Sequence, residues 1–318
     1  MESSTSTGST ATLSATSEQR IVVTGASGLI GQALCFALAA AGHPITKLVR
    51  RSPGPGEAQW DPTAGTIDAS ALEGCWAVVH LAGEGIADSK WTAEHKAKVL
   101  ESRVKGTTLL ATTLAGLRQK PQVFASGSAI GFYGDRQNDT ITEASSAGTG
   151  FLADVVKAWE ASAQPAVAAG IRTVFLRTGI VLSTKGGALK QQLLPFKLGL
   201  GGRFGSGKQY LPWIALDDEV GAIIHCLHTA SLSGPVNLTA PTPVTNAAFT
   251  KALGQAVHRP TLIPTPLFPV KILYGAEMVK EMLLGGANVL PTALLISGFT
   301  FQQTDLGAAL AHLLVTKS

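Results

Sequence analysis

Gly25-Ala26-Ser27-Gly28-Leu29-Ile30-Gly31 lies between the β-branched run Arg20 to Thr24 (RIVVT) and an Ala- and Leu-rich stretch that ends at Ala41. The β-branched run predicts a strand, and the stretch from Gly28 to Ala41, which contains no proline, predicts a helix. A GxxGxxG turn between a strand and a helix is typical of dinucleotide-binding domains. The first glycine permits the sharp turn, the second lets the backbone approach a pyrophosphate, and the third allows close packing of the helix on the strand.

The start of this helix gives a second reason for a phosphate to bind here. Its first N–H groups have no acceptor within the helix, and the helix dipole places a partial positive charge beside them. Glycines at this spacing also serve tight packing where no ligand is present, so the strand and helix on either side decide in favour of binding. The residues of the turn that we expect to contact a dinucleotide are Gly25, Ser27, Gly28, Leu29, Ile30 and Gly31.

Strands and helices alternate through the rest of this half of the chain. Apolar runs that predict strands are Ile45 to Val49, Ala77 to Leu81, Gln122 to Ser126 and Thr173 to Leu176. Helical segments precede the later runs, as the crossovers of a parallel sheet require. The predicted fold class is therefore α/β, with a Rossmann-type doubly wound parallel sheet.

The character of the chain changes in its second half. From Gly186 onward, Gly- and Pro-rich loops are mixed with amphipathic helices predicted around Ala247 to Val257 and Val270 to Leu284. We interpret residues 20–182 as the Rossmann domain, to which residues 213–240 return. Residues 183–212 and 241–318 are interpreted as a smaller C-terminal α/β lobe that holds the substrate.

The residues after the second strand predict which dinucleotide is preferred. An acidic side chain at this place accepts hydrogen bonds from a ribose 2′-hydroxyl, whereas arginine pairs with a 2′-phosphate. Arg50 and Arg51 follow the run Ile45 to Val49. Two solvated surface arginines are the alternative, but their place in the fold favours NADP(H) over NAD(H) as the cofactor.

Composition excludes several classes of protein. The 318 residues are 45% hydrophobic, which is enough for one large domain or two coupled domains. Gly, Pro or charged residues interrupt every apolar stretch before it reaches the roughly 20 residues of a membrane-spanning helix, so no membrane partner is expected. The net charge of +4 comes from scattered Lys and Arg without a basic run, so no nucleic acid partner is expected either.

The N-terminus and the cysteines bear on the compartment. Residues Met1 to Gln19 are rich in Ser and Thr and lack the apolar middle of a signal peptide. We interpret them as a disordered tail and expect a cytoplasmic protein; a transit-peptide remnant, and hence an organelle, is the alternative. Cys35, Cys75 and Cys226 lie far apart in apolar surroundings, which indicates reduced core cysteines.

Taken together, these features resemble the extended short-chain dehydrogenase/reductase superfamily. Further motifs narrow the resemblance. They are Trp60-Asp61-Pro62, His80-Leu81-Ala82-Gly83-Glu84, Ser102-Arg103-Val104-Lys105-Gly106-Thr107, Gly131-Phe132-Tyr133-Gly134-Asp135, Leu198-Gly199-Leu200-Gly201-Gly202 and Pro241 to Asn246 (PTPVTN). This ordered set is highly specific and resembles the atypical epimerase family proteins of the SDR39U1 type, with the C-terminal domain typical of that family. The resemblance runs from about Arg20 to the C-terminus.

The resemblance implies further contacts with the cofactor. In this family the two arginines after the second strand fall where the adenosine phosphate is held. Arg103 matches a cofactor-contacting position at which ordinary extended members carry Asn, so it would add positive charge near the cofactor; an exposed helical arginine is the alternative. Val181, in the run Leu176 to Leu182, matches a loop that closes over the nicotinamide side. The positions whose backbone lines the cofactor by this resemblance are Leu81, Ala82 and Gly83.

The catalytic residues depart from the superfamily pattern. Ordinary members use Ser or Thr with a Tyr-x-x-x-Lys pair, in which the Lys lies one helical turn from the Tyr and lowers its pKa. In the corresponding helix, Phe151 to Glu160, the Tyr and Lys places are held by Leu152 and Val156, which carry no proton. Ser128, expected just after a strand, and Tyr133 are the nearest catalytic candidates, with turn and packing roles as the alternatives.

No metal site is expected, because the seven histidines form no HExxH pair and none stands at metal-ligand spacing with Cys or Asp. Two functions remain open. The first is an NADP(H)-dependent oxidoreductase or nucleotide-sugar-epimerase-like enzyme that holds a small-molecule substrate between its domains. The second is a non-catalytic NADP(H)-binding sensor or assembly protein. The sequence names neither the substrate nor the oligomeric state.

Overall fold

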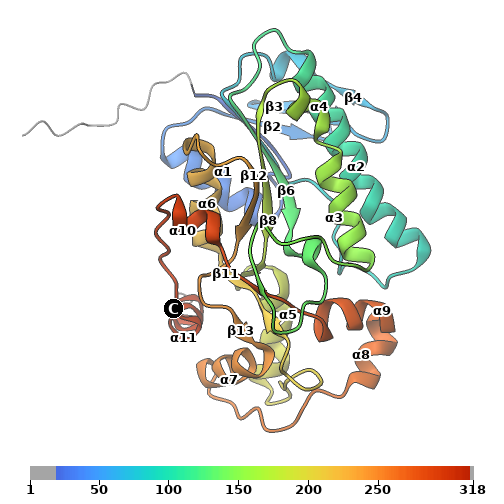
Figure 1. The fold of residues 1–318 in the computed structure, drawn as a ribbon, viewed down its shortest axis with the longest axis vertical. Helices are drawn as coiled ribbons and strands as arrows, with labels where there is room; N and C mark the ends of the chain where they lie inside the picture. Colours follow the sequence, from blue (N-terminus) through green and yellow to red (C-terminus); the bar gives the residue numbers. More distant parts are fainter. Residues whose placement is uncertain (1–18, 316–318) are drawn as a thin grey trace, which may run out of the picture.

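A sheet of eight strands forms the centre of the molecule (Figure 1). The computed structural model describes residues 19–315, so the tail and transit-peptide interpretations concern residues that lie outside the described part, apart from Gln19. Strands from β12 to β3 pair in parallel, and β4 pairs antiparallel with β3. The spatial order is β12 (Gly234–Leu238), β8 (Arg172–Thr178), β6 (Val123–Ala129), β5 (Ala77–His80), β1 (Ile21–Thr24), β2 (Ile45–Val49), β3 (Glu57–Asp61) and β4 (Thr66–Ile67).

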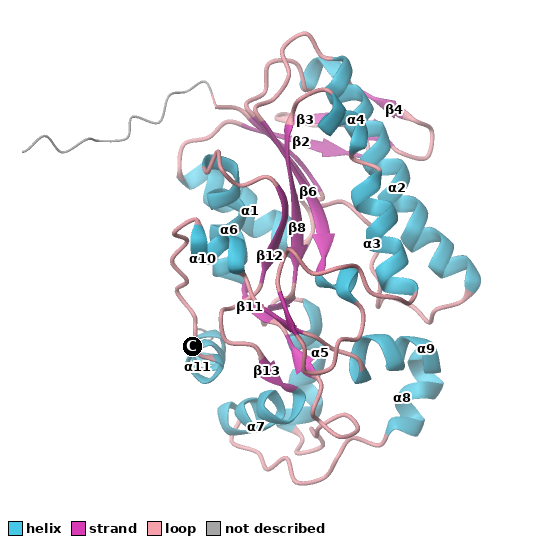
Figure 2. Ribbon diagram, viewed as in Figure 1, coloured by secondary structure: helices cyan, strands magenta, loops and turns pink. Residues whose placement is uncertain are grey.

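Helices cover both faces of this sheet (Figure 2). On one face lie α1 (Leu29–Ala40) and α6 (Leu216–His228), and on the other lie α2 (Ala93–Gly116), α3 (Phe151–Ala161) and α4 (Gln164–Ala168). Every residue of β1 and β5 is buried as a result, and a separate apolar core fills the space on each face. The predicted Rossmann-type doubly wound sheet is confirmed.

The strands predicted from apolar runs are present, with bounds that differ by a few residues. The largest difference is β6, which continues past Ser126 to Ala129. Ser128 therefore lies inside a strand, and its predicted place after the strand end is wrong. Strand β3 escaped prediction because its sequence, EAQWD, has no β-branched residue.

A smaller lobe lies beyond the carboxyl ends of the parallel strands (Figure 1). Its two short strand pairs are β9 (Ile180–Leu182) with β11 (Trp213–Ala215), and β10 (Tyr210–Leu211) with β13 (Val244–Thr245). Its helices include α5 (Gly187–Lys197), α7 (Asn246–Ala256) and α11 (Leu306–Val315), which share a third apolar core. Because β9 follows β8, β11 precedes α6 and β13 follows β12, the chain passes between the sheet and the lobe at each of these connections.

Residues 267–296, which we call the crossing segment, pass between the two parts. Helices α8 (Leu267–Tyr274) and α9 (Ala276–Met278) are followed by a π-helical turn, Val279–Leu284. The single helix predicted from Val270 to Leu284 is therefore wrong: Gly275, at φ +91°, ends α8. Strand β14 (Asn288–Val289) then pairs with β7 (Thr140–Ile141), and α10 (Thr292–Ile296) packs against β12. Among residues 19–315, no helix is both long and apolar enough to cross a membrane.

Candidate functional site

The GxxGxxG turn is clamped between β5 and the first turn of α1. Gly25 has a φ of +68°, and a Cβ built there would lie 2.6 Å from the carbonyl carbon of Leu81. A Cβ on Gly31 would overlap the carbonyl oxygen of Gly25. At Gly28 the nearest atom to such a Cβ is that same oxygen, at 3.3 Å. Gly25 and Gly31 are thus required by packing, whereas the space around Gly28 is open to a ligand.

No side chain of residues 19–315 caps the N-terminus of α1. Its N-cap is Gly28, and no acidic residue occupies its first turn. Helices α2 and α3 differ, because Thr92 accepts from the N–H of His95 at the start of α2 and Glu281 accepts from two N–H groups at the start of α3. The N–H groups at the start of α1 therefore face a place where an anion would fit.

Buried hydrogen bonds fix the Leu81–Ala82 loop against the turn. The Thr24 hydroxyl oxygen accepts from the N–H groups of Leu81 (3.1 Å) and Ala82 (3.2 Å), and lies 2.7 Å from His80 Nδ1. His80 Nε2 lies 3.0 Å from the hydroxyl of Thr107. Burial, and secondarily the charge of Arg103, lowers the pKa of His80 to about 4, so the imidazole is neutral and serves the network rather than proton transfer.

The two arginines after β2 differ in their hydrogen-bonding partners. Arg51 donates through Nη2 to Glu57 Oε1 at 2.6 Å, and the guanidinium remains largely exposed. Arg50 is exposed and makes no hydrogen bond or ion pair with any described residue. Of the pair, Arg50 is therefore free to bind a 2′-phosphate, while Arg51 would have to share its guanidinium with a carboxylate.

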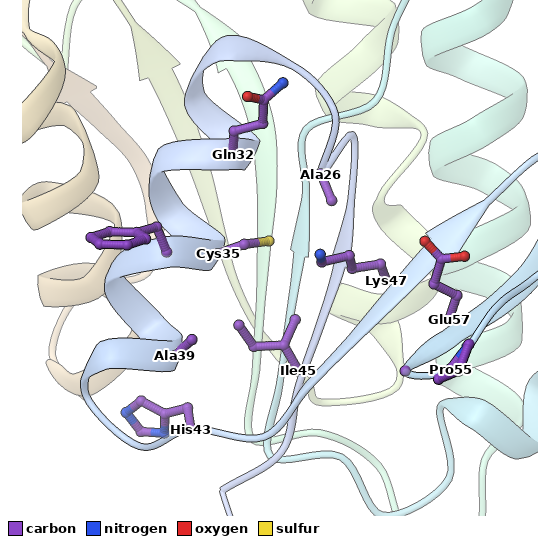
Figure 3. A pocket seen from close by; sticks show the side chains of 11 residues that line it. Ala26, Gln32, Cys35, Ala39, His43, Ile45, Lys47, Pro55 and Glu57 are labelled. Carbon is purple, nitrogen blue, oxygen red and sulfur yellow. The ribbon is translucent and has the colours of Figure 1, made fainter.

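A cavity of about 500 Å³ lies between α1 and the residues of β2 and β3 (Figure 3). Ala26 of the GxxGxxG turn and Glu57, the partner of Arg51, both line it. Cys35 and Lys47 point toward one another across it (Figure 3). The cavity is on the adenosine side of the turn, and it extends away from the strand ends at which a nicotinamide would lie.

Arg103 is buried beneath the loop that follows β5. Its Nη1 donates to the carbonyl oxygens of Glu84 (2.9 Å) and Val99 (3.0 Å), and its guanidinium carbon lies 4.9 Å from the centre of the Trp159 ring. A Cβ on Gly83 would come within 3.3 Å of that carbon. Gly83 itself is exposed. The guanidinium thus supports the loop from below, and the alternative of an exposed helical arginine is wrong.

Val181 lies in β9, whose carboxyl end leads back over α1. The loop that follows β9 approaches Leu29, since a Cβ on Gly186 would lie 3.5 Å from a methyl group of Leu29. A Cβ on Gly187 would lie 3.4 Å from the carbonyl oxygen of Val181. The structure therefore brings Val181, the GxxGxxG turn and the Leu81–Gly83 loop to the same edge of the sheet.

The helix that usually carries Tyr and Lys presents apolar side chains to this edge. Leu152 and Val156 pack against Gly131, since a Cβ there would lie 3.3 Å and 3.8 Å from their side chains. Lys157 is on another side of α3, where its ammonium pairs with Asp154 at 2.7 Å near solvent. No basic residue of α3 thus lies beside the place from which the superfamily tyrosine acts.

Ser128 belongs to a buried ionic network that the sequence did not reveal. Its hydroxyl donates to Glu160 Oε1 at 2.5 Å, and the same carboxylate accepts from Arg177 Nε (2.8 Å) and Nη2 (2.9 Å). Arg177 is 3% exposed. The signal in the sequence was Arg177, one of two arginines in the otherwise mostly apolar strand β8, because a buried guanidinium is usually paired with a carboxylate.

Tyr133 is fully buried, at 0% exposure. Its hydroxyl donates to Asn237 Oδ1 at 2.7 Å and accepts from Arg177 Nη1 at 2.9 Å. Burial raises the pKa of this phenol, against the opposing effect of Arg177. Both hydrogen-bonding directions of the hydroxyl are occupied, and this geometry favours the packing role over proton transfer to a substrate.

Within residues 19–315, no group of three or more His, Cys, Asp or Glu side chains is arranged to hold a metal ion. The three cysteines are buried and free. The residues present fit a dinucleotide instead, because an uncapped helix start, an open glycine and an unpaired arginine face the carboxyl edge of the sheet together.

Comparison with known proteins points to one family. A model of the NAD dependent epimerase/dehydratase family matches residues 21–238, and a model of a domain of unknown function matches residues 265–313. An epimerase family protein of Mycobacterium bovis is 43% identical over 293 residues, which are 92% of this chain and 96% of that protein. The human epimerase family protein SDR39U1 is 38% identical over 297 residues, covering 92% and 99% of the two chains.

Solved structures agree. The crystal structure of human SDR39U1 (isoform 2) with NADPH superposes with a TM-score of 0.85 at 36% identity, and covers 93% of this chain and 99% of that one. UDP-glucose 4-epimerase from Thermotoga maritima, solved with UDP-glucose, has a TM-score of 0.73 at 16% identity, with 93% and 97% coverage. The latter likeness shows a shared fold.

Proposed function

The chain belongs to the NAD dependent epimerase/dehydratase family, as its motifs indicated, and we propose that it is an NADP(H)-dependent oxidoreductase or epimerase-like enzyme acting on a small molecule. The observation that carries the proposal is the uncapped start of α1 beside an open glycine, with the unpaired Arg50 at the end of the neighbouring strand β2. A solved relative that contains NADPH supports the same cofactor.

In this proposal the cofactor supplies or accepts the hydride, and the chain binds and orients it. The start of α1 holds the pyrophosphate, and Arg50 holds the 2′-phosphate. Thr24 and His80 fix the Leu81–Ala82 loop, so that the cofactor meets a rigid backbone. The substrate lies between the sheet edge and the smaller lobe, because clefts between domains are common ligand sites.

The proton that accompanies hydride transfer cannot come from the places that Tyr and Lys usually hold. Leu152 and Val156 carry none, and the Tyr133 hydroxyl is already committed to Asn237 and Arg177. Ser128 is 4% exposed and its hydroxyl donates to Glu160, so this proton is committed as well. We propose that water at the cleft completes the proton transfer.

Titration of the purified protein with NADPH and NADH tests the cofactor assignment. We expect saturable binding of NADPH and binding of NADH at least about tenfold weaker, because NADH lacks the phosphate that Arg50 pairs with. Arg50→Glu should weaken NADPH binding and leave NADH binding unchanged. Arg118→Glu, which reverses an exposed charge on the loop after α2, is the matched control. Equal affinity for the two dinucleotides would overturn the assignment.

The apolar pair at Leu152 and Val156 favours a second candidate function, a non-catalytic NADP(H) sensor or assembly protein. Consumption of NADPH across a panel of carbonyl compounds supports the enzyme. Tight NADPH binding without turnover, together with a partner whose affinity differs between NADPH and NADP⁺, supports the sensor. A cytoplasmic location is part of either proposal, and cell fractionation tests it.

A further inference from the structure

Arg103 is a buried cation with no carboxylate to neutralise it. It is 7% exposed, and no carboxylate among residues 19–315 lies within 4.0 Å of its guanidinium. Its Nη1 bonds only to carbonyl oxygens, and its Nε has no hydrogen-bond partner. Glu84 acts on it from a greater distance. Burial lowers the pKa of Arg103 to about 10, which still leaves it charged at pH 7.

The other buried arginine at this edge is compensated. Arg177 forms two hydrogen bonds with the carboxylate of Glu160, so this pair adds little net charge to the site. Arg103 is held by neutral groups, the two carbonyls and the face of the Trp159 ring. The charge of Arg103 therefore lacks a carboxylate in contact with it, and it acts on its surroundings, including His80.

The order of the strands places this charge on the nicotinamide side. The pyrophosphate of a dinucleotide rests at the start of α1, and the adenosine lies toward the end of β2, where Arg50 is. The nicotinamide half must extend the other way, over the ends of β5 and β6. Gly83 follows β5, faces solvent on one side, and has the Arg103 guanidinium against its other side.

We propose that Arg103 makes this site selective for the reduced cofactor, so that NADPH binds more tightly than NADP⁺. This inference rests on the proposed binding of NADP(H). The two forms carry the same phosphates, but the oxidised nicotinamide ring bears a positive charge that the reduced ring lacks. A fixed, uncompensated cation beneath the ring repels only the oxidised form.

The expected preference is measurable. Two like unit charges about 10 Å apart in a partly screened protein site repel each other enough to weaken binding by about tenfold. A neutral ring at the same place is not repelled. The wild-type protein should therefore bind NADPH about tenfold more tightly than NADP⁺. If Arg103 served only the phosphates, it would strengthen both forms equally and leave their ratio near one.

Calorimetric titration of NADPH and NADP⁺ into the wild-type protein and into Arg103→Gln tests the proposal. Arg103→Gln should bring the two dissociation constants together, mainly by tightening NADP⁺. Arg103→Lys, which keeps the charge, should retain much of the wild-type ratio. Lys105→Gln removes an exposed charge from the same helix, where Lys105 pairs with Glu101 at 2.6 Å, and should leave the ratio unchanged.

The outcomes separate this inference from the proposed function. No saturable binding of either form by the wild-type protein contradicts the cofactor assignment itself. A wild-type ratio near one, or a preference for NADPH that survives in Arg103→Gln, overturns the role of Arg103 while leaving the assignment intact. If Arg103→Gln fails to fold, a wild-type ratio near one still overturns the proposal, because that ratio is measured on the folded wild-type protein.

Discussion

Gly28 and Gly31 belong to one motif but differ in how closely neighbouring atoms approach them. A Cβ on Gly31 would overlap the carbonyl oxygen of Gly25 inside the protein, while a Cβ on Gly28 would meet that oxygen at 3.3 Å on the open side of the turn. Neither glycine has a positive φ, so contact rather than backbone strain decides the effect of a methyl group at each position.

We expect Gly28→Ala to weaken NADPH binding by about tenfold or more with a loss of less than about 1 kcal/mol in the free energy of unfolding, because the added methyl group occupies ligand space. Gly31→Ala should cost about 2–4 kcal/mol, because α1 must move away from β1. Urea unfolding and NADPH titration of both variants provide the measurements. Equal losses of stability in the two variants would contradict the separate roles.

At this scale, the sequence indicated the glycine turn but not the partners of the polar residues. The three glycines are tied to a local turn, which their spacing reveals. The partners of Tyr133 and Ser128 lie far away in the chain, at Asn237, Arg177 and Glu160. No local pattern indicates such contacts, so the sequence supplied chemically suitable side chains without showing that other groups already occupied them.

Among the elements, α3 depends on a residue from the crossing segment. The carboxylate of Glu281 accepts from the N–H groups of Phe151 (2.9 Å) and Leu152 (3.0 Å), and it serves as the cap that Gly150 has no side chain to provide. This contact ties the π-helical turn to the helix whose Leu152 and Val156 face the sheet edge.

Replacing Glu281 with Ala should lower the free energy of unfolding by about 1–2 kcal/mol, because two N–H groups at the helix start lose a charged acceptor. Chemical unfolding measures the loss. Glu277→Ala is the matched control from the same segment, since Glu277 forms an exposed ion pair with Lys96, and such pairs contribute less than about 1 kcal/mol. A larger effect from Glu277 than from Glu281 would count against this account of the cap.

Some elements of this fold could be predicted from the sequence and others could not. Strands with β-branched runs were predictable, because burial on both faces of a parallel sheet demands such residues. The break between α8 and α9 was not, since Gly275 stands in an otherwise helical pattern and its positive φ is set by surrounding structure. Strand β3 lacks an apolar run because only alternate residues, Ala58 and Trp60, are buried in the core.

At the scale of the whole molecule, α6 joins the smaller lobe to the sheet, and it buries a carboxyl group at that junction. Glu219 is 0% exposed; Thr178 donates to its Oε1 at 2.8 Å, and its Oε2 has no hydrogen-bond partner. Burial raises the pKa of Glu219 to about 8, from an ordinary value of 4.5. The folded protein thus holds this proton over a pH range in which the unfolded chain has released it.

The stabilising effect of that bound proton is complete below about pH 4.5 and is lost as the pH rises toward 8. Buried His80, with its pKa lowered to about 4, acts in the opposite sense below pH 6.5, so measurements between pH 6.5 and 8 isolate the carboxyl group. There the wild-type free energy of unfolding should fall by about 1 kcal/mol per pH unit. Glu219→Gln, which keeps the shape without the titrating proton, should remove most of this decline in urea unfolding. A decline of the same slope in the variant would show that Glu219 is not its source.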